Sequence, residues 1–170
     1  AVGKVWEYAL TDAGEELRPI IMALGHWGAR WIGSRLRDDE LDAGLLMWDI
    51  RRFVRLDECP PHAVVVHFRF RDARSGEKTW WLVVEEGAAD LCRDDPGREL
   101  TLVVDSTVRA LTEVWTGDRS PQEVLSSRDL RVEGALHEAQ NLWRWLGASV
   151  FAETRRSARP ALLSDPRPSA

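Results

Sequence analysis

Three side chains that could bind a metal ion lie close together in the middle of the chain, Cys59, His62 and His67. A cysteine and a histidine three residues apart resemble part of a zinc site, which needs four ligands, or three and a water, in tetrahedral geometry. Only one cysteine contributes here, and Pro60 and Pro61 stiffen the segment that joins the first two candidates. We therefore expect a turn between a helix and a strand at this point, with no metal site and no cofactor.

Nucleophilic and acid–base chemistry is equally unsupported. A nucleophile elbow requires glycines framing the serine, and the serines of the second half lack them: Ser106, Ser120, Ser126, Ser127 and Ser149. No glycine-rich phosphate loop occurs. The adjacent carboxylates Glu85–Glu86 and Asp94–Asp95 fall in turn-like stretches, where such pairs are solvated. The sequence predicts that the chain is not an enzyme and has no catalytic residues.

Tryptophan is the unusual residue, with nine copies against four phenylalanines and one tyrosine. Such rings pack cores and domain contacts, or they line an aromatic pocket or a subunit interface. Trp80 and Trp81 are adjacent on a predicted strand, so one faces the core and the other must be covered by another element, a partner or a ligand. Arg69 and Arg71 of the neighbouring strand could stack on the outer ring. Domain packing and a pocket wall both remain open.

Composition bounds the function further. The 170 residues are 44% hydrophobic and 30% charged, with a net charge of -5, a globular composition that argues against general nucleic-acid binding. Two distant cysteines favour a reducing cytoplasm. No apolar run is long enough for a membrane helix, and no leader is visible. Because the chain starts with Ala1 inside a strand-like pattern, we expect it to be the C-terminal part of a longer protein.

One long amphipathic helix is predicted over residues 11–31. Thr11 is a suitable N-cap, and Pro19, two turns inside, is expected to bend the helix. Large apolar residues recur at the 3.6-residue period and form one stripe. The stripe consists of Leu17, Ile20, Ile21, Leu24, Trp27 and Trp31.

The remaining elements predict an α+β fold. Hydrophobic alternation and turn signals favour strands over 4–10, 63–71, 78–85, 88–93, 100–104 and 129–133. The four from 63 to 104 are spaced as an antiparallel meander. Helical periodicity predicts helices over 39–56, from Asp105 or Ser106 to 115, from 121, and over 135–147, and an unstructured tail after Ala152.

The segment YALTDAGEELRPIIMALGHW (8–27) resembles the end of a winged-helix transcription regulator of the HxlR group, which is related to the MarR type. In that group a wing strand ends in a tyrosine-x-leucine-threonine motif, and a long helix follows that ends near a tryptophan–glycine pair. The matching residues are Tyr8, Leu10, Thr11, Gly14, Leu17, Pro19, Leu24, Trp27 and Gly28. The resemblance covers about 30 residues, and the helix-turn-helix itself would lie upstream.

Residues 98–147 resemble the C-terminal half of the sterol carrier protein type-two fold. That family follows its strands with a helix ending in tryptophan-x-glycine, a short helix, a strand with a glycine and a final helix. The corresponding residues are Leu111, Trp115, Gly117, Gly134, Ala139 and Leu146. The preceding helix and strands of 39–95 fit the same fold, with a five-stranded, mostly antiparallel sheet covered by helices.

Together the resemblances imply three parts: a wing remnant and dimerisation helix (1–37), a sterol-carrier-like ligand-binding domain (38–152) and a C-terminal tail (153–170). They imply a homodimeric cytoplasmic regulator that contacts DNA through an upstream winged helix and forms its dimer through the stripe of residues 11–31. A small apolar ligand would contact Phe68, Phe70, Trp80, Leu82, Leu111, Trp115 and Trp143. A stand-alone lipid carrier and a ligand-free structural domain are the alternatives.

Overall fold

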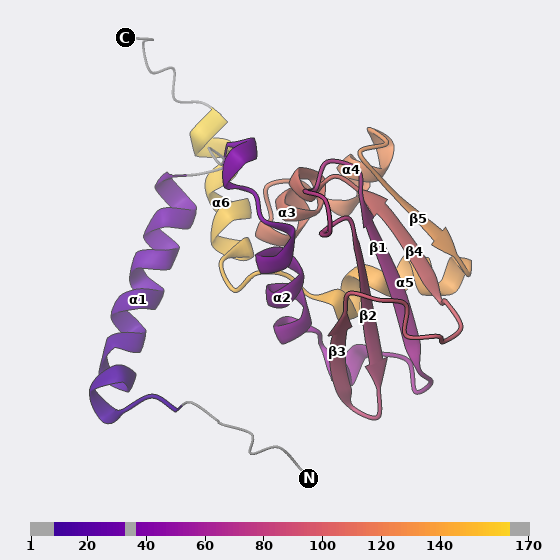
Figure 1. Ribbon diagram of the computed structural model, residues 1–170. Coiled ribbons are helices and arrows are strands. Elements are labelled where there is room, and N and C mark those ends of the chain that lie inside the picture. The colour runs from indigo at the N-terminus through magenta and orange to yellow at the C-terminus, as the bar shows by residue number, and fades with distance from the viewer. Residues whose placement is uncertain (1–8, 33–36, 164–170) are drawn as a thin grey trace.

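The computed structural model describes residues 9–32 and 37–163, with side chains as far as residue 158. Within these residues the fold is α+β: one five-stranded sheet with helices packed on one face, as predicted (Figure 1). The strand order is β3-β2-β1-β4-β5. The strands are β1 (Val64–Phe70), β2 (Thr79–Glu85), β3 (Ala88–Cys92), β4 (Leu102–Ser106) and β5 (Leu130–Gly134).

Three of the neighbouring strand pairs are antiparallel, but β4 pairs with β1 in parallel. The prediction of a four-strand meander is therefore wrong after β3. The segment between β3 and β4 crosses the outer face of the sheet, where Arg98 forms an ion pair with Glu85 of β2. It then reaches β1, since the amide of Thr101 donates to Val65 O at 2.9 Å. This connection is long enough to place β4 on the far side of β1.

The described residues form six α-helices: α1 (Asp12–Trp31), α2 (Ala43–Phe53), α3 (Val108–Thr116), α4 (Pro121–Ser126), α5 (Leu136–Leu146) and α6 (Ala152–Leu163). The helix expected over 39–56 is shorter, because Asp42 caps it through its side chain and the backbone of Val54 is extended. Single 3₁₀ turns, Asp38–Glu40 and Leu56–Glu58, flank it. The predicted strand 4–10 falls almost wholly outside the described residues, and Ala9 and Leu10 are not in a strand.

Besides Asp42 at α2, polar side chains cap three further helices. Thr11 accepts a hydrogen bond from the amide of Gly14 at 3.2 Å, which confirms it as the N-cap of α1. α3 starts later than expected, with Thr107 as its cap, because β4 continues through Ser106. Ser120 and Glu123 form a reciprocal capping box at α4.

The core lies between the inner face of the sheet and helices α2, α3 and α5. Alternate strand residues such as Val66 and Phe68 point into it, and Leu111 of α3 and Leu142 of α5 meet them from the helix side. Trp145 of α5 is fully buried in the same cluster. One contiguous core therefore holds the sheet and these three helices together.

The expectation of an unstructured tail after Ala152 is wrong for residues 152–163, which form α6. Arg155 and Ala158 of α6 are buried although the segment carries few apolar residues. The helix is held by polar contacts to the rest of the chain, which the hydrophobic pattern does not reveal. In Figure 1, α6 lies between α1 and the other helices.

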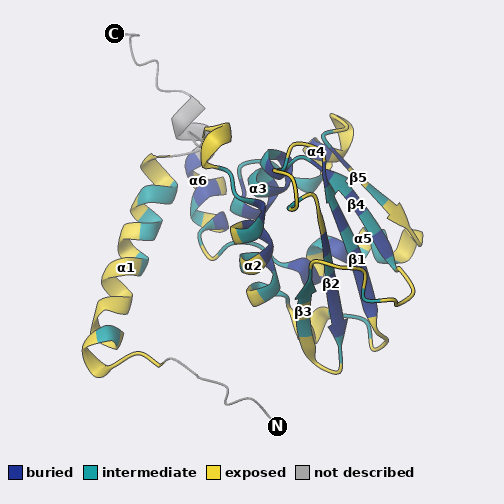
Figure 2. Ribbon diagram, viewed as in Figure 1, coloured by how far each residue is buried: buried dark blue, intermediate teal, exposed yellow. Residues whose placement is uncertain are grey.

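α1 differs from the other long helices because none of its residues is buried (Figure 2). It runs without a break through Pro19. Among the described elements, its main contacts are made with α6. The described part of the chain thus leaves the apolar stripe of α1 uncovered.

Candidate functional site

α1 packs on α6 through one side only. Gly25 gives the Phe151 ring room, since a Cβ at this glycine would lie 2.2 Å from the ring tip. His26 Nδ1 lies 2.7 Å from Thr154 Oγ1, and its ring meets Phe151 edge-on at 5.1 Å. Near the end of the helix, the guanidinium of Arg155 donates to Ala29 O at 2.9 Å. Glycine, histidine and alanine positions therefore make up the intramolecular side of α1.

The apolar stripe lies on the opposite side of α1. Successive residues rotate by about 100° around an α-helix, so residues 25, 26 and 29 point away from residues 17, 20, 24 and 27. The side chains of the stripe are 52% to 61% exposed, and all six residues that the sequence assigned to a dimer interface belong to it. These are Leu17, Ile20, Ile21, Leu24, Trp27 and Trp31. Exposed apolar patches of this kind are typical of interaction surfaces.

The residues assigned to an apolar ligand lie together in the core of the sheet domain. Six are 0% to 6% exposed: Phe68 and Phe70 of β1, Trp80 and Leu82 of β2, and Leu111 and Trp115 of α3. Trp143 of α5 is half-buried and packs against this cluster. The structure thus brings all seven into one apolar region between sheet and helices, where they also serve as core residues.

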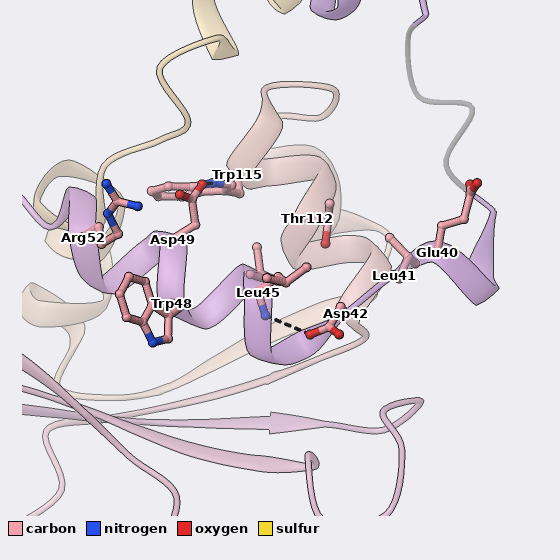
Figure 3. A pocket seen from close by; sticks show the side chains of 10 residues that line it. Glu40, Leu41, Asp42, Leu45, Trp48, Asp49, Arg52, Thr112 and Trp115 are labelled. Atoms are coloured by element: carbon pink, nitrogen blue, oxygen red, sulfur yellow. Dashed lines mark hydrogen bonds between the residues drawn. The ribbon is translucent and has the colours of Figure 1, made fainter. Parts of the chain in front are cut away.

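A groove between α2 and α3 borders this region and is shown in Figure 3. Its volume is about 380 Å³, and it is open to solvent. Trp115 is the one predicted ligand residue that lines it, and the indole Nε1 of Trp115 donates to Asp49 at 2.8 Å. Leu45 and Trp48 of α2 form its apolar wall, and both are exposed. The periodicity of residues 39–56 predicts a helix here but does not show which of its apolar residues face solvent.

Trp80 and Trp81 face opposite sides of the sheet, as predicted, but arginines do not cover the outer ring. Trp81 stacks on His67 with ring centroids 4.3 Å apart and planes 8° apart. The guanidinium of Arg69 is instead paired with Asp105, and that of Arg71 donates to Asp129 O at 2.7 Å. Stacking of Arg69 or Arg71 on Trp81 was therefore a wrong expectation, since each finds an oxygen acceptor on a neighbouring strand or turn.

The titratable side chains first considered for metal binding have other surroundings. Cys59 Sγ donates to Arg55 O at 3.4 Å, and burial together with Asp57 raises the pKa of its thiol. His62 Nε2 lies 3.5 Å from a Glu138 oxygen. Burial and the nearby Arg69 charge lower the pKa of His67, so its ring is neutral at pH 7. Within 9–32 and 37–163, no three His, Cys, Asp or Glu side chains are clustered for metal binding.

A polar connection that sequence reasoning missed links the sheet domain to α1. Arg155 Nε of α6 donates to Asp118 at 2.5 Å, just after α3, while its Nη1 donates to Ala29 O of α1. The amide of Ser149 donates to Trp115 O at 2.9 Å. Gly117 lies against the start of α6, because a Cβ there would be 2.6 Å from Ala152 O. The only sequence feature that could have indicated this connection was the tryptophan-x-glycine turn, because the basic, proline-containing tail predicted disorder.

The N-terminal region has a match among known families. Residues 1–35 match the HxlR-like helix-turn-helix family. This segment includes α1 and is about one fifth of the chain. No curated protein matches this chain.

Several solved structures have a similar fold. A double mutant of the sec-alkylsulfatase PisA1 has a TM-score of 0.53 and 12% identity over 65% of this chain, and this chain spans 17% of that enzyme. The UbiJ-SCP2 ubiquinone synthesis protein has 15% identity and a TM-score of 0.37, covering 88% of this chain and 97% of that one. Sterol carrier protein 2 like 2 from Aedes aegypti has 9% identity and a TM-score of 0.42, covering 58% of this chain and 91% of that one. At these identities the likeness concerns the fold alone.

The described residues contain no helix that is both long enough and apolar enough to cross a membrane.

Proposed function

We propose that this chain is the dimerisation and effector-sensing part of a bacterial HxlR-type transcription regulator that acts in the cytoplasm. The observation that carries the proposal is the exposed stripe of α1, six large apolar side chains that α6 leaves uncovered. The family match over residues 1–35 supports the regulator class. DNA would be contacted by a winged helix that precedes the described residues.

A second copy of the chain is the partner that the proposal gives to the stripe. Two equivalent helices packed along their apolar sides bury the same residues in both copies, the usual arrangement of a twofold dimer. Dimeric regulators present their two recognition helices at a spacing fixed by the subunit interface. A change in the angle of α1 would therefore alter operator affinity.

The effector would be a small apolar molecule bound among the seven core residues of the sheet domain. Trp115 supports this location, because it belongs to the core and also lines the open groove beside α2. The proposal involves no catalytic step. Its alternative is a filled core that binds nothing and serves only to position α1.

The contacts of α6 offer a physical route from effector to dimer. A ligand beside Trp115 would press on the end of α3, which contacts α6 through Ser149 and Gly117. α6 in turn holds α1 through Arg155. A shift of α3 would reach the dimer helix through these contacts, which is the coupling between two sites that allosteric control requires.

The proposed dimer is tested with the triple variant Leu24→Ala, Trp27→Ala, Trp31→Ala in sedimentation velocity. Loss of three large anchors at an interface is expected to raise the dimer dissociation constant at least 100-fold, by the roughly 2 kcal/mol typical of one buried anchor residue and more for three. Leu136→Ala is the matched control, because Leu136 is also an exposed leucine on a helix but lies on α5. A triple variant that sediments as the wild type does would contradict the dimer assignment.

The effector is tested separately by native mass spectrometry of the purified chain. A co-purified apolar adduct, reduced in Trp143→Ala, would support the ligand site because Trp143 lies at the margin of the core. Repeated absence of any adduct would favour the filled core and would leave the dimer proposal standing.

A further inference from the structure

α2 exposes an apolar surface although its other side is deeply buried. Met47 and Ile50 are fully buried, whereas Leu45 is 73% and Trp48 is 55% exposed. Trp48 borders the groove of Figure 3, and the guanidinium of Arg52 lies 5.8 Å from its ring centre. This surface is not needed for the fold of the chain, since no described element covers it.

Charge changes sign along this surface. Glu40 and Asp42 lie before the apolar residues, at the start of α2, and Arg52 lies after them. Arg52 has no carboxylate partner within the described part of the chain. Apart from Asp49, which also lines the groove and accepts a hydrogen bond from the Trp115 indole, the surface is acidic at the start of the helix, apolar in the middle and basic at the end.

α1 shows the same order of charge beside its own stripe. Asp12 and Glu16 lie in its first turns, and Arg30 lies in its last turn. Neither Glu16 nor Arg30 has an ion-pair partner among residues 9–32 and 37–158. Two surfaces with the same order of charge are complementary when they run antiparallel, and the helix dipoles then oppose each other favourably as well.

We propose that the groove between α2 and α3 is the docking site for α1 of a second copy, with the two helices antiparallel. This inference rests on the proposed function, because it names the surface that covers the α1 stripe in the dimer. Glu16 of one copy then lies near Arg52 of the other, and Arg30 near Asp42. The apolar stripe falls on Leu45 and Trp48.

The dimensions agree with this arrangement. At 1.5 Å per residue, Glu16 and Arg30 are about 21 Å apart along the helix axis, and Asp42 and Arg52 are about 15 Å apart. The long arginine side chains span the difference. Centred in this way, Leu24 lies about 1.5 Å along the axis from Leu45, and Ile21 lies about 1.5 Å from Trp48.

The α1 of the same chain is not the occupant. Its position on α6 is fixed by the packing of Gly25 on Phe151 and by the hydrogen bond from Arg155 to Ala29. In that position its stripe is exposed. Reciprocal docking of two copies buries both stripes and both α2 surfaces, so that each apolar surface meets a partner.

The first test replaces Trp48 with alanine and measures the dimer dissociation constant by sedimentation. Trp48→Ala is expected to raise that constant at least tenfold, as loss of a central aromatic anchor does. Leu136→Ala again serves as the control and is expected to leave it unchanged. Trp48 is exposed in the single chain. The far-UV circular dichroism and the thermal unfolding of the dilute Trp48→Ala variant should therefore match those of the wild type.

The second test exchanges charges. Arg52→Glu and Glu16→Arg are each expected to weaken the dimer about fivefold, and the double variant is expected to recover most of the wild-type affinity. Arg128→Glu, on an exposed turn away from both helices, controls for the change in net charge. Recovery in the double variant is specific to a pairing between these two positions.

The outcomes separate this inference from the proposed function. A wild-type chain that is monomeric at every concentration overturns both. A dimer that is dissociated by the triple α1 variant but is unaffected by Trp48→Ala and Arg52→Glu overturns only the docking site. A Trp48→Ala variant that binds the apolar dye 1-anilinonaphthalene-8-sulfonate less well, while its dimer is unchanged, assigns the groove to a small ligand and overturns it too.

Discussion

α1 and α3 carry the same kind of sequence pattern and meet different surroundings. In α3, Val108, Leu111 and Trp115 recur at helical spacing and are buried in the chain's own core. In α1, apolar residues recur at the same spacing and remain exposed, among them Leu17, Ile20, Ile21 and Leu24. Hydrophobic periodicity therefore tells which side of a helix must be covered, but not whether the cover comes from the same chain.

The largest predicted difference between the two helices concerns stability. Leu111→Ala is expected to lower the free energy of unfolding by about 2–5 kcal/mol, the usual cost of truncating a fully buried leucine. Leu24→Ala is expected to change it by less than about 0.5 kcal/mol in dilute solution, because an exposed side chain loses little. Urea unfolding of both variants, at a protein concentration below the dimer dissociation constant, checks this prediction. A similar loss of unfolding free energy in both variants would refute the contrast.

The next effect lies in the connection between the two regions. Arg155 is 7% exposed, and Arg155→Ala leaves Asp118 half-buried without its partner. We expect a loss of about 3 kcal/mol, at the lower end of the range for breaking a buried ion pair, with faster amide hydrogen exchange in α1 and α6. Arg156→Ala removes an exposed ion pair with Glu153 on the same helix and should cost less than about 0.5 kcal/mol. Equal effects of the two substitutions would exclude Arg155 as the link.

A pair of glycines sharpens the assignment of the two sides of α1. Gly25→Ala places a Cβ against the Phe151 ring and is expected to weaken the packing of α1 on α6 by about 1–2 kcal/mol. At Gly28 the nearest side-chain atom to a Cβ is 3.9 Å away, so Gly28→Ala should instead gain up to about 1 kcal/mol of helix propensity. Hydrogen exchange of α1 distinguishes them. Opposite signs are predicted, and two neutral results would argue against the contact with Phe151.

The smallest effect belongs to the sheet domain and should leave α1 unaffected. The pKa of His67 is lowered in the folded chain, so the neutral ring contributes stability above the unfolded pKa near 6.5, and that contribution is lost as the pH falls through the lower folded value. His67→Gln removes this dependence. The stability difference between wild type and variant, measured by urea unfolding, should shrink from pH 8 to pH 5, with an unchanged dimer dissociation constant. A constant difference would show that His67 does not titrate in this range.

The sequence predicted the elements better than their arrangement. The capping threonine, the periodicity of α1 and the alternation of β1 identify local structure, because each depends on neighbours within a few residues. The parallel pairing of β4 with β1 depends on a crossing segment whose direction the residues do not specify. The sequence did not predict α6, because this helix is held by Arg155 and its hydrogen bonds and has no apolar stripe.

For the candidate site, the structure places the seven core residues in one apolar region and the six stripe residues on one helix, and their roles as ligand site and dimer interface stay predictions. Sequence reasoning could not tell what packs on either group, because apolar residues recur with the same spacing whether a helix, a ligand or a second chain packs on them. The exposed side of α2 was hidden for the same reason. Leu45 and Trp48 alternate with buried residues of α2, and only the position of the sheet shows which of these residues face the core and which face solvent.

The central claim is that two copies of the chain form a dimer through α1. Light scattering over a dilution series, which measures the molecular mass of the wild-type chain in solution, tests this claim most directly. We predict twice the 19.3 kDa of one chain at micromolar concentrations, falling toward 19.3 kDa on dilution. A mass of 19.3 kDa at every concentration would contradict it, because the α1 stripe would then remain exposed without a second copy to cover it.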